Sequence, residues 1–263
     1  MNDLNNTFKE KLFYGIIGSL IFLLIWAGAG YLLTIHPDFQ HFAGFHPKAT
    51  FKAFYGLLFD GLFWDSVIAS LNRIIVGLSF SLVLGIPIGM LVGFYKPIWQ
   101  ITYYPIQFLR MISPLSWMPI AILVFATFDS SIYFLITVAC VWPILLNTAQ
   151  GVNRVNKDFM SMAINQGATD WQLLTKIILP SAIPYMIIGL RLALGIAWVV
   201  LVPAEFLGVS SGLGYSINDA RDTLEYDRLL AIVFAIGCLG LMLDSLVQFA
   251  EKRCYLKFMA KPG

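Results

Sequence analysis

Several ionisable side chains stand inside long apolar stretches of this sequence. Arg110, Arg191, Glu205 and Asp244 each interrupt a hydrophobic run, and Arg73 begins another. An arginine at the centre of a membrane helix costs about 2.5–3.5 kcal/mol on insertion scales, so such a group calls for a function or a partner. Arg110 and Arg191 are candidates to attract an anion, and Glu205 is a candidate gate residue. The alternative is that each arginine pairs with a carboxylate or a helix-end carbonyl, or reaches the interface. Glu205 would then pair with an arginine, and Asp244 with a partner in the bundle or a basic neighbour.

Other residue types that could do chemistry lack the necessary spacing. Three histidines between residues 36 and 46 recur every five residues, whereas metal-binding pairs on a helix stand four apart. The cysteines, Cys140, Cys238 and Cys254, have no metal-ligand spacing, and their odd number argues against a disulfide framework. The embedded charges are scattered and of mixed sign, unlike an enzyme's cluster of catalytic groups. We therefore predict no metal, no cofactor and no catalytic residue.

The composition indicates which solvent surrounds these residues. Of the 263 residues 59% are hydrophobic and 12% are charged, and the mean hydropathy is +0.77. Soluble domains carry about 25% charged residues, so this chain could not cover itself with a charged surface. A lipid bilayer fits the composition. The net charge of +2 and the lack of a basic run argue against a nucleic-acid partner.

Six stretches are long enough to cross a bilayer as helices, which needs about 20 residues each. They are Leu12–Thr34, Ser66–Tyr95, Ile98–Phe125, Ser131–Gln150, Pro180–Phe206 and Leu229–Ala250. The first is too long for the apolar core of a cleaved signal peptide and reads as a retained helix. The predicted fold is an all-α, polytopic membrane protein with about six spans. It divides into residues 1–11, a transmembrane domain of residues 12–250, and a tail of residues 251–263.

The orientation of the chain in the membrane is predicted from the positions of its lysines and arginines. With the N-terminus inside, 10 of the 17 fall in cytoplasmic segments, 4 outside and 3 within spans, which the positive-inside rule favours. Both termini are then cytoplasmic. Outside, residues 36–65 favour an interfacial helix, and residues 207–228 read as a polar loop. Residues 151–179 form the longest cytoplasmic loop, which has few helix breakers and reads as a docking surface.

One motif within that loop carries the function. Residues 161–180 read SMAINQGATDWQLLTKIILP, which resembles the cytoplasmic loop of ABC import permeases: Glu-Ala-Ala, three residues, Gly, nine residues, then Ile-x-Leu-Pro. The matching positions are Ala163, Gly167, Ile177, Leu179 and Pro180. Ser161 and Met162 depart from the pattern, which puts in doubt an ion pair made by the missing glutamate. We expect Pro180 to end the loop and start the next span.

The physical properties of the loop suit a docking knob. Gly167 can adopt a positive φ and allow a sharp turn between two short helices. Ala163 and Ala168 are small enough for a partner to approach closely. Trp171 and Leu173 are apolar anchors of the kind that dominate interfaces. The alternative is an ordinary amphipathic connector between two spans.

A longer stretch, from about Trp64 to Asp244, resembles the permeases of nitrate, bicarbonate, sulfonate and taurine importers. The resemblance is carried by SLNRIIVGLSFSLVLGIPIGMLVG (residues 70–93), PIQFLRMISPLSWMPIAILVF (105–125), WPILLNTAQGV (142–152) and GLRLALGIAWVVLVPAEFLGVSSGLG (189–214). The Ser-Pro-Leu-x-Trp-x-Pro run at residues 113–119 is more similar to the nitrate and bicarbonate members.

The resemblance implies a larger machine in an inner membrane. Two permease copies line one pathway for a small anion, two cytoplasmic ATP-binding subunits dock on the loops, and a periplasmic or lipid-anchored binding protein delivers the substrate. The chain has no G-x-x-x-x-G-K-[ST] phosphate loop, so a partner must hydrolyse the ATP. The competing hypothesis is a stand-alone secondary transporter or channel. No internal repeat of the kind common in secondary transporters is visible, and such a protein needs no docking loop.

Overall fold

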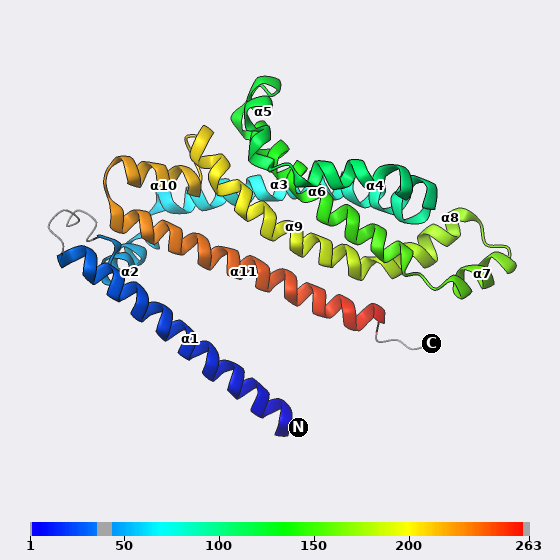
Figure 1. Cartoon of the computed structure of the whole chain (residues 1–263), viewed down its shortest axis with the longest axis horizontal. Coiled ribbons are helices and arrows are strands. Elements are labelled where there is room, and N and C mark those ends of the chain that lie inside the picture. The colour runs from blue at the N-terminus through cyan, green and yellow to red at the C-terminus, as the bar shows by residue number, and fades with distance from the viewer. Residues whose placement is uncertain (1, 36–43, 260–263) are drawn as a thin grey trace. The chain divides into compact units, whose positions relative to one another are not determined.

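The computed structural model describes residues 2–35 and 44–259, and these residues form helices joined by short connections (Figure 1). In chain order the elements are α1 (Asn2–Ile35), α2 (Pro47–Leu57), α3 (Gly61–Phe94), α4 (Lys96–Met111), η2 (Pro114–Trp117), α5 (Met118–Val124), α6 (Phe128–Asn153), α7 (Lys157–Asn165), α8 (Asp170–Leu173), η3 (Leu174–Ile178), α9 (Leu179–Gly208), α10 (Leu213–Asp222) and α11 (Tyr226–Met259). The predicted all-α fold is confirmed. His36, His41 and residues 260–263 of the predicted tail lie outside the described residues.

Five of the six predicted spans are present as continuous apolar helices. They cover Phe13–Leu32, Gly61–Phe94, Phe128–Asn153, Asp170–Gly208 and Tyr226–Arg253. The third span, predicted to run unbroken from Ile98 to Phe125, is instead a bent pair, Lys96–Met111 and Pro114–Val124, with an angle of 87° between them.

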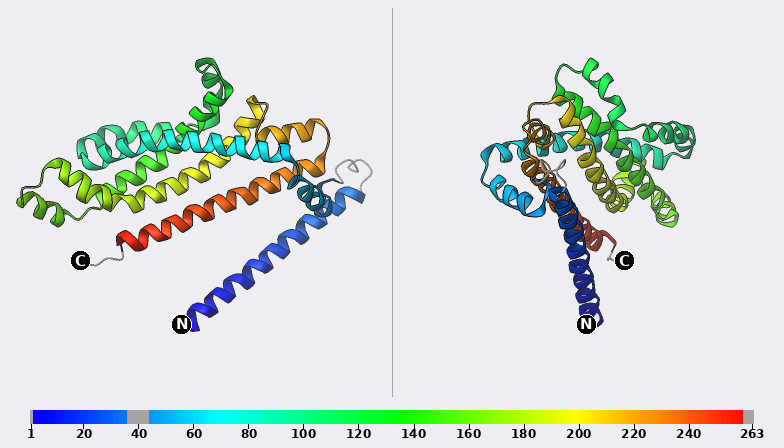
Figure 2. Two further views of the ribbon diagram at one scale, coloured as in Figure 1. Left: turned by 180° about the vertical axis from the view of Figure 1, so that it is seen from behind. Right: turned by 60° about the vertical axis from the view of Figure 1, so that its left-hand side comes forward.

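A proline explains the break in the third span. Ser113, directly before Pro114, has a ψ angle of 128°, because a residue before a proline is disfavoured in the helical region. Ile112, which precedes Ser113, is also non-helical, with a ψ angle of 126°. Pro114 then begins the short helix η2. Figure 2 shows α5 projecting away from the long helices that follow it.

The chain divides into two compact units, which we describe separately. The smaller consists of Met1–Trp64 and Ser216–Ile236. In it, α2 is the helix predicted for residues 36–65; it starts at Pro47, with His46 as its N-cap. Edge-to-face ring contacts hold α2 to α11: the Phe234 ring lies 5.3 Å from that of Phe51 and 5.1 Å from that of Phe54.

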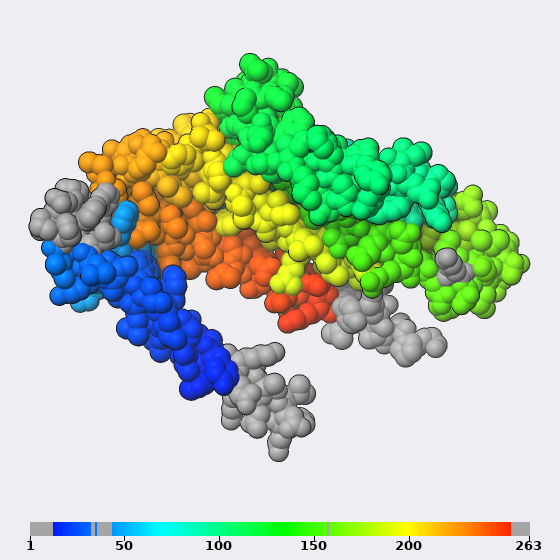
Figure 3. All heavy atoms as spheres, viewed as in Figure 1, coloured from blue at the N-terminus to red at the C-terminus, as the bar shows by residue number. Residues whose placement is uncertain are grey.

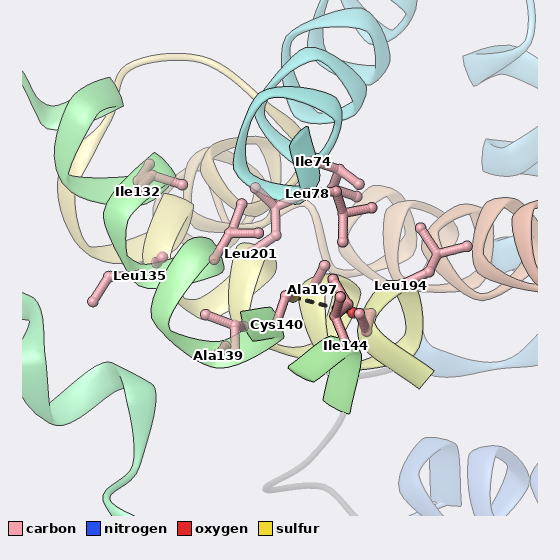
Figure 4. Packing of buried hydrophobic residues seen from close by; sticks show 14 of the residues in the cluster. Ile74, Leu78, Ile132, Leu135, Ala139, Cys140, Ile144, Leu194, Ala197 and Leu201 are labelled. Atoms are coloured by element: carbon pink, nitrogen blue, oxygen red, sulfur yellow. Dashed lines mark hydrogen bonds between the residues drawn. The ribbon is translucent and has the colours of Figure 1, made fainter. Parts of the chain in front are cut away.

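The larger unit, Asp65–Tyr215 with Gly237–Gly263, contains the main core. Helices α6 and α9 pack along each other, and α3 packs against them from Ile74 onward (Figures 1 and 4). The core side chains shared by these helices include Ile74, Leu78, Ile132, Leu135, Cys140, Ile144, Ala197 and Leu201. Because all three helices are apolar around much of their circumference, close packing must select the faces that meet.

A stripe of small residues selects the face that α3 presents to α6. Every fourth residue from 77 to 93 is glycine or serine, the spacing that lets membrane helices approach closely. A Cβ atom added at Gly89 would lie 2.6 Å from the Leu145 carbonyl oxygen, and one added at Gly93 would lie 2.7 Å from that of Ala149. The two backbones are therefore in contact. This signal was available in the sequence but was not used in the prediction.

The segment predicted as a polar loop, residues 207–228, contains the helix α10. Leu213 and Ala220 are fully buried, and Ile217 between them is half-buried. Their spacing of four and three residues forms an apolar stripe along one face of a helix. The polar residues between them conceal that stripe in a hydropathy average, which explains the error.

Candidate functional site

The loop that carries the motif folds into two short helices at one end of α6 and α9 (Figures 1 and 2), and we call residues 157–178 the knob. Asn156 caps α7 by accepting a 2.8 Å hydrogen bond from the Asp158 N–H. The helix ends at Asn165, and Gly167, two residues later, has a φ of +82°, which confirms the predicted turn. Across that turn the Ala168 N–H donates to the Ala163 carbonyl at 3.0 Å. Nothing lies within 4 Å of a Cβ built on Gly167, so backbone conformation rather than space requires glycine here.

The second half of the knob is built onto α9. Thr169 and Gln172 form a capping box that starts α8. A single π-helical turn, η3, joins α8 to α9, so the helix continues from Asp170 to Gly208. Pro180 therefore lies in the first turn of α9 without starting a separate helix, which corrects the predicted boundary. A wide turn beside a proline is one way to keep a helix continuous despite the missing N–H.

The two predicted anchors of the knob behave differently. The Trp171 side chain is 71% exposed, whereas Leu173 is 3% exposed and cannot contact a partner. Phe159, Met162 and Ile164 on α7 are also more than half exposed. The knob, which lies at the right-hand end of Figure 3, thus has four exposed large apolar residues, and of these Trp171 was predicted as an anchor.

The Ile-x-Leu-Pro end of the motif fastens the knob to the bundle. Ile177 and Leu179 pack against a buried cluster formed by α6, η3 and α9. Its buried members are Val152, Val155, Ile178, Ala182 and Met186. These two motif residues therefore act as a joint. No loop separates α8 from α9, because η3 continues the helix between them.

A buried ion pair lies at the opposite end of α9. Glu205 is completely buried, and Arg73 is 4% exposed. The Arg73 Nη1 donates to the Glu205 carboxylate at 2.6 Å, and its Nε donates to Asp129 at 2.8 Å. Ser70 donates a further hydrogen bond to Glu205 at 2.8 Å. Glu205 therefore pairs with an arginine, one of the two roles considered for it.

The same network fastens the segment that follows α9. The Gly214 N–H donates to Glu205 at 2.9 Å, and Arg73 donates to both the carbonyl and the hydroxyl of Ser211. Gly212 has a φ of +105°, and a Cβ there would collide with Arg73 and Glu205. A buried pair of this kind is tolerated only when hydrogen bonds satisfy its remaining polar atoms, as they do here.

Arg191 is also neutralised by carboxylates. Its Nε and Nη2 form a two-pronged contact with Asp244, at 2.9 and 3.1 Å. Its Nη1 donates to Glu251 at 3.2 Å. All three residues belong to the larger unit, so the pairing joins α9 to the second half of α11.

Arg110 differs from the other two arginines. It lies in the last turn of α4, next to the 87° break. Among the residues whose side chains the structure describes (13–32, 35, 44–156 and 158–253), no carboxylate comes within ion-pair distance of its guanidinium and its side chain forms no hydrogen bond. Arg110 instead lines a pocket of about 430 Å³ between α4, η2, α6 and α9, together with Trp142 and Asn147.

Comparison with known proteins places these features in a family. The family of binding-protein-dependent transport system inner membrane components matches residues 85–254. The bicarbonate transport system permease protein CmpB of Synechocystis sp. is 36% identical over 90% of this chain and 86% of its own length. CmpB of Synechococcus elongatus is 38% identical over 75% of this chain and 71% of its own. The nitrate import permease protein NrtB of Leptolyngbya laminosa is 33% identical over 74% and 69%.

A solved structure shares the fold. A chain of the MetNI methionine ABC transporter, in an inward-facing conformation, superposes with a TM-score of 0.62 over 73% of this chain and 94% of its own, at 19% identity. The family match covers well over half of the sequence, and it includes α6, the knob and α9. The chain belongs to the family of binding-protein-dependent transport system inner membrane components: it is a multi-pass permease subunit of an ABC importer, a transport protein and not an enzyme, whose family works with ATP-hydrolysing and substrate-binding partners.

Proposed function

We propose that this permease forms the translocation pathway of an importer for a small inorganic oxyanion of the nitrate or bicarbonate class. The names of the CmpB and NrtB relatives support this class over the sulfonate and taurine class. In the proposed complex, two copies of the chain line one pathway and two cytoplasmic ATP-binding subunits dock on their knobs. A periplasmic or lipid-anchored binding protein delivers the anion at the other side of the membrane.

The observation that carries the coupling role is the exposed apolar surface of the knob. Trp171, Phe159, Met162 and Ile164 are each more than half exposed, on a segment outside the membrane in the proposed topology. Aromatic residues, methionine and exposed apolar patches are typical of protein interfaces. A stand-alone transporter would have no use for such a surface.

The proposed orientation puts the knob and both termini in the cytoplasm. With the bent pair counted as one span, the chain crosses the membrane six times. The N-terminal end of α1, the C-terminal end of α11 and the connection between α6 and α9 are then on the same side of the membrane. The excess of lysine and arginine in these segments supports the cytoplasm as that side.

The continuous helix from Asp170 to Gly208 suggests how ATP binding by the partner subunits changes the conformation of the translocation pathway. Closure of the ATP-binding subunits would move the knob, and the joint at Ile177 and Leu179 would carry the movement into α9. The far end of α9 is held by the Glu205–Arg73 pair, so the helix would tilt as a rigid body. Such tilting exchanges inward-facing and outward-facing states, as in other transporters that move rigid elements.

The first test is co-purification of an ATP-binding subunit with the tagged permease from its native membrane. Trp171→Ala removes the largest exposed anchor, and truncating such an anchor commonly weakens an interface by about 2 kcal/mol or more, roughly 30-fold in affinity. We expect the ATPase band to be lost or strongly reduced. Tyr104→Ala, an aromatic that is 78% exposed on α4, is the control and should leave the band unchanged.

Two results would contradict the proposal. An ATPase band of equal strength in wild type and in Trp171→Ala would remove Trp171 from the docking surface. The absence of any ATPase from the wild-type sample, together with uptake that proceeds without ATP, would favour the stand-alone transporter.

A further inference from the structure

We propose that Arg110 and the pocket beside it form a binding site for the transported oxyanion during its passage through the membrane. This inference rests on the proposed function and names the residue that holds the substrate. The anion would accept hydrogen bonds from the Arg110 guanidinium at the break between α4 and η2. No covalent step is involved.

The three arginines in the spans differ in whether carboxylates compensate their charge. Arg73 faces Asp129 and Glu205, and Arg191 faces Asp244 and Glu251. In both cases two carboxylates compensate one guanidinium. Arg110 has no such compensation among the described residues, although it too lies within an apolar segment. An ionised group at membrane depth needs a counter-charge or water, and a passing anion supplies the counter-charge.

The second argument is the pocket itself. Its volume of about 430 Å³ is ample for a small oxyanion and several water molecules. The Asn147 amide lies on its wall, held in place by a 2.8 Å hydrogen bond from its nitrogen to the Pro143 carbonyl. Most of the other lining residues are apolar: Ile112, Val138, Ala139, Leu146, Leu192 and Ile196. Apolar walls lower the local dielectric and strengthen the attraction between a guanidinium and an anion.

The third argument is the broken helix next to Arg110. Ile112 and Ser113 are non-helical, so the helical hydrogen bonding stops between α4 and η2. At membrane depth, irregular backbone occurs where it is buried in protein or lines a water-filled cavity. Discontinuous helices of this kind are common at the substrate sites of transporters. The break and the unpaired arginine meet at the same pocket.

The chemistry of arginine suits this class of substrate. Its planar fork of N–H donors matches the geometry of a planar oxyanion such as nitrate or bicarbonate. A single arginine in an open pocket also binds weakly enough for release, which conduction requires. A lipid phosphate offers the same oxygens to the arginine and is the competing source of the counter-charge.

The test is ATP-driven uptake of nitrate and of bicarbonate by the complete complex reconstituted in liposomes. Arg110→Gln should lower the maximum uptake rate about 10-fold or more, because losing a hydrogen bond to a charged group commonly changes an equilibrium by that factor. Arg110→Lys keeps the charge and should retain clearly more uptake than Arg110→Gln. Lys96→Gln removes the same charge from the other end of α4 and should change uptake less than about twofold, as for a surface charge.

The outcomes separate this inference from the proposed function. If wild type shows no ATP-driven uptake of either anion, the proposed function fails. If wild type is active and Arg110→Gln transports equally well, this inference alone is overturned. If Arg110→Gln loses uptake in anionic liposomes but matches wild type in purely zwitterionic ones, Arg110 binds a lipid headgroup, which also overturns the inference.

A second variant guards against a failure of assembly. Arg110→Cys is assembled in a chain that also carries Cys238→Ser and Cys254→Ser, while the fully buried Cys140 stays. After assembly, the new thiol is modified with a methanethiosulfonate reagent that adds either an ammonium or a sulfonate group. We expect the positive adduct to raise uptake and the negative adduct to leave it low or reduce it further. Equal effects of the two adducts would overturn the inference, since a merely structural side chain would not distinguish the signs.

Discussion

At the scale of single residues, the arginines divide by what compensates their charge. Glu205 accepts hydrogen bonds from Arg73, Ser70 and the Gly214 N–H and is fully buried. Removing one member of such a pair leaves the other charged and buried without a partner, which is more costly than losing the attraction alone. The pair is therefore expected to behave as a unit.

We expect Glu205→Ala to lower the free energy of unfolding by about 3–5 kcal/mol, the usual cost of breaking a buried ion pair. Thermal unfolding of the purified chain in detergent measures the loss. Adding Arg73→Ala should cost much less than the sum of the two single changes. Asp222→Ala, in an exposed pair with Arg221, is the control and should cost about 1 kcal/mol or less. Additive losses for Glu205 and Arg73 would show that the two residues act independently.

At the scale of elements, the contact between α3 and α6 depends on side chains that are missing. A Cβ at Gly89 would lie 2.6 Å from one backbone atom of α6 and 2.8 Å from the Thr148 Cβ. Neither neighbour is the free end of a flexible side chain, so the helices themselves would have to separate. Gly195 on α9 provides the contrast, since nothing lies within 4 Å of its added Cβ.

Gly89→Ala should therefore destabilise the chain by about 1–3 kcal/mol through overpacking. Gly195→Ala, the same change in another membrane helix, should be neutral or stabilising by up to about 1 kcal/mol, because alanine favours helix. Both variants are compared by unfolding in detergent. Equal stability of the two would mean that α3 and α6 are not in backbone contact.

At the scale of the whole molecule, the proposed topology of six crossings puts the knob on one side of the membrane and the connection between α10 and α11 on the other. Ser161 in the knob and Thr223 after α10 are both exposed polar positions. Each tolerates cysteine as a nearly isosteric replacement. They therefore report on the two sides with little effect on the fold.

In intact cells whose outer membrane is permeable to the reagent, we expect a charged maleimide to label Thr223→Cys and to leave Ser161→Cys unlabelled until the cells are lysed. The background again lacks Cys238 and Cys254. The reverse pattern would invert the proposed orientation. Labelling of both cysteines from the same side would mean that the chain crosses the membrane an even number of times between them, which contradicts the proposed topology.

The sequence by itself determined the class of the protein, because the signals for that class are local. Hydropathy over about 20 residues located the five continuous apolar helices, and it placed a sixth span where the structure has the bent pair. The spacing from Gly167 to Pro180 identified the knob, and the positive φ at Gly167 was predicted from residue type alone.

Only the tertiary structure decided which embedded charges are neutralised. Arg73 and Glu205 are 132 residues apart in the sequence, and their meeting depends on the register in which α3 and α9 pack. The same reason explains why Leu173 is buried while Trp171 is exposed. The local pattern of apolar residues determines which segments enter the membrane, whereas packing between helices determines which side chains face one another. The pairing of side chains depends on contacts between distant segments, so it does not follow from the local sequence.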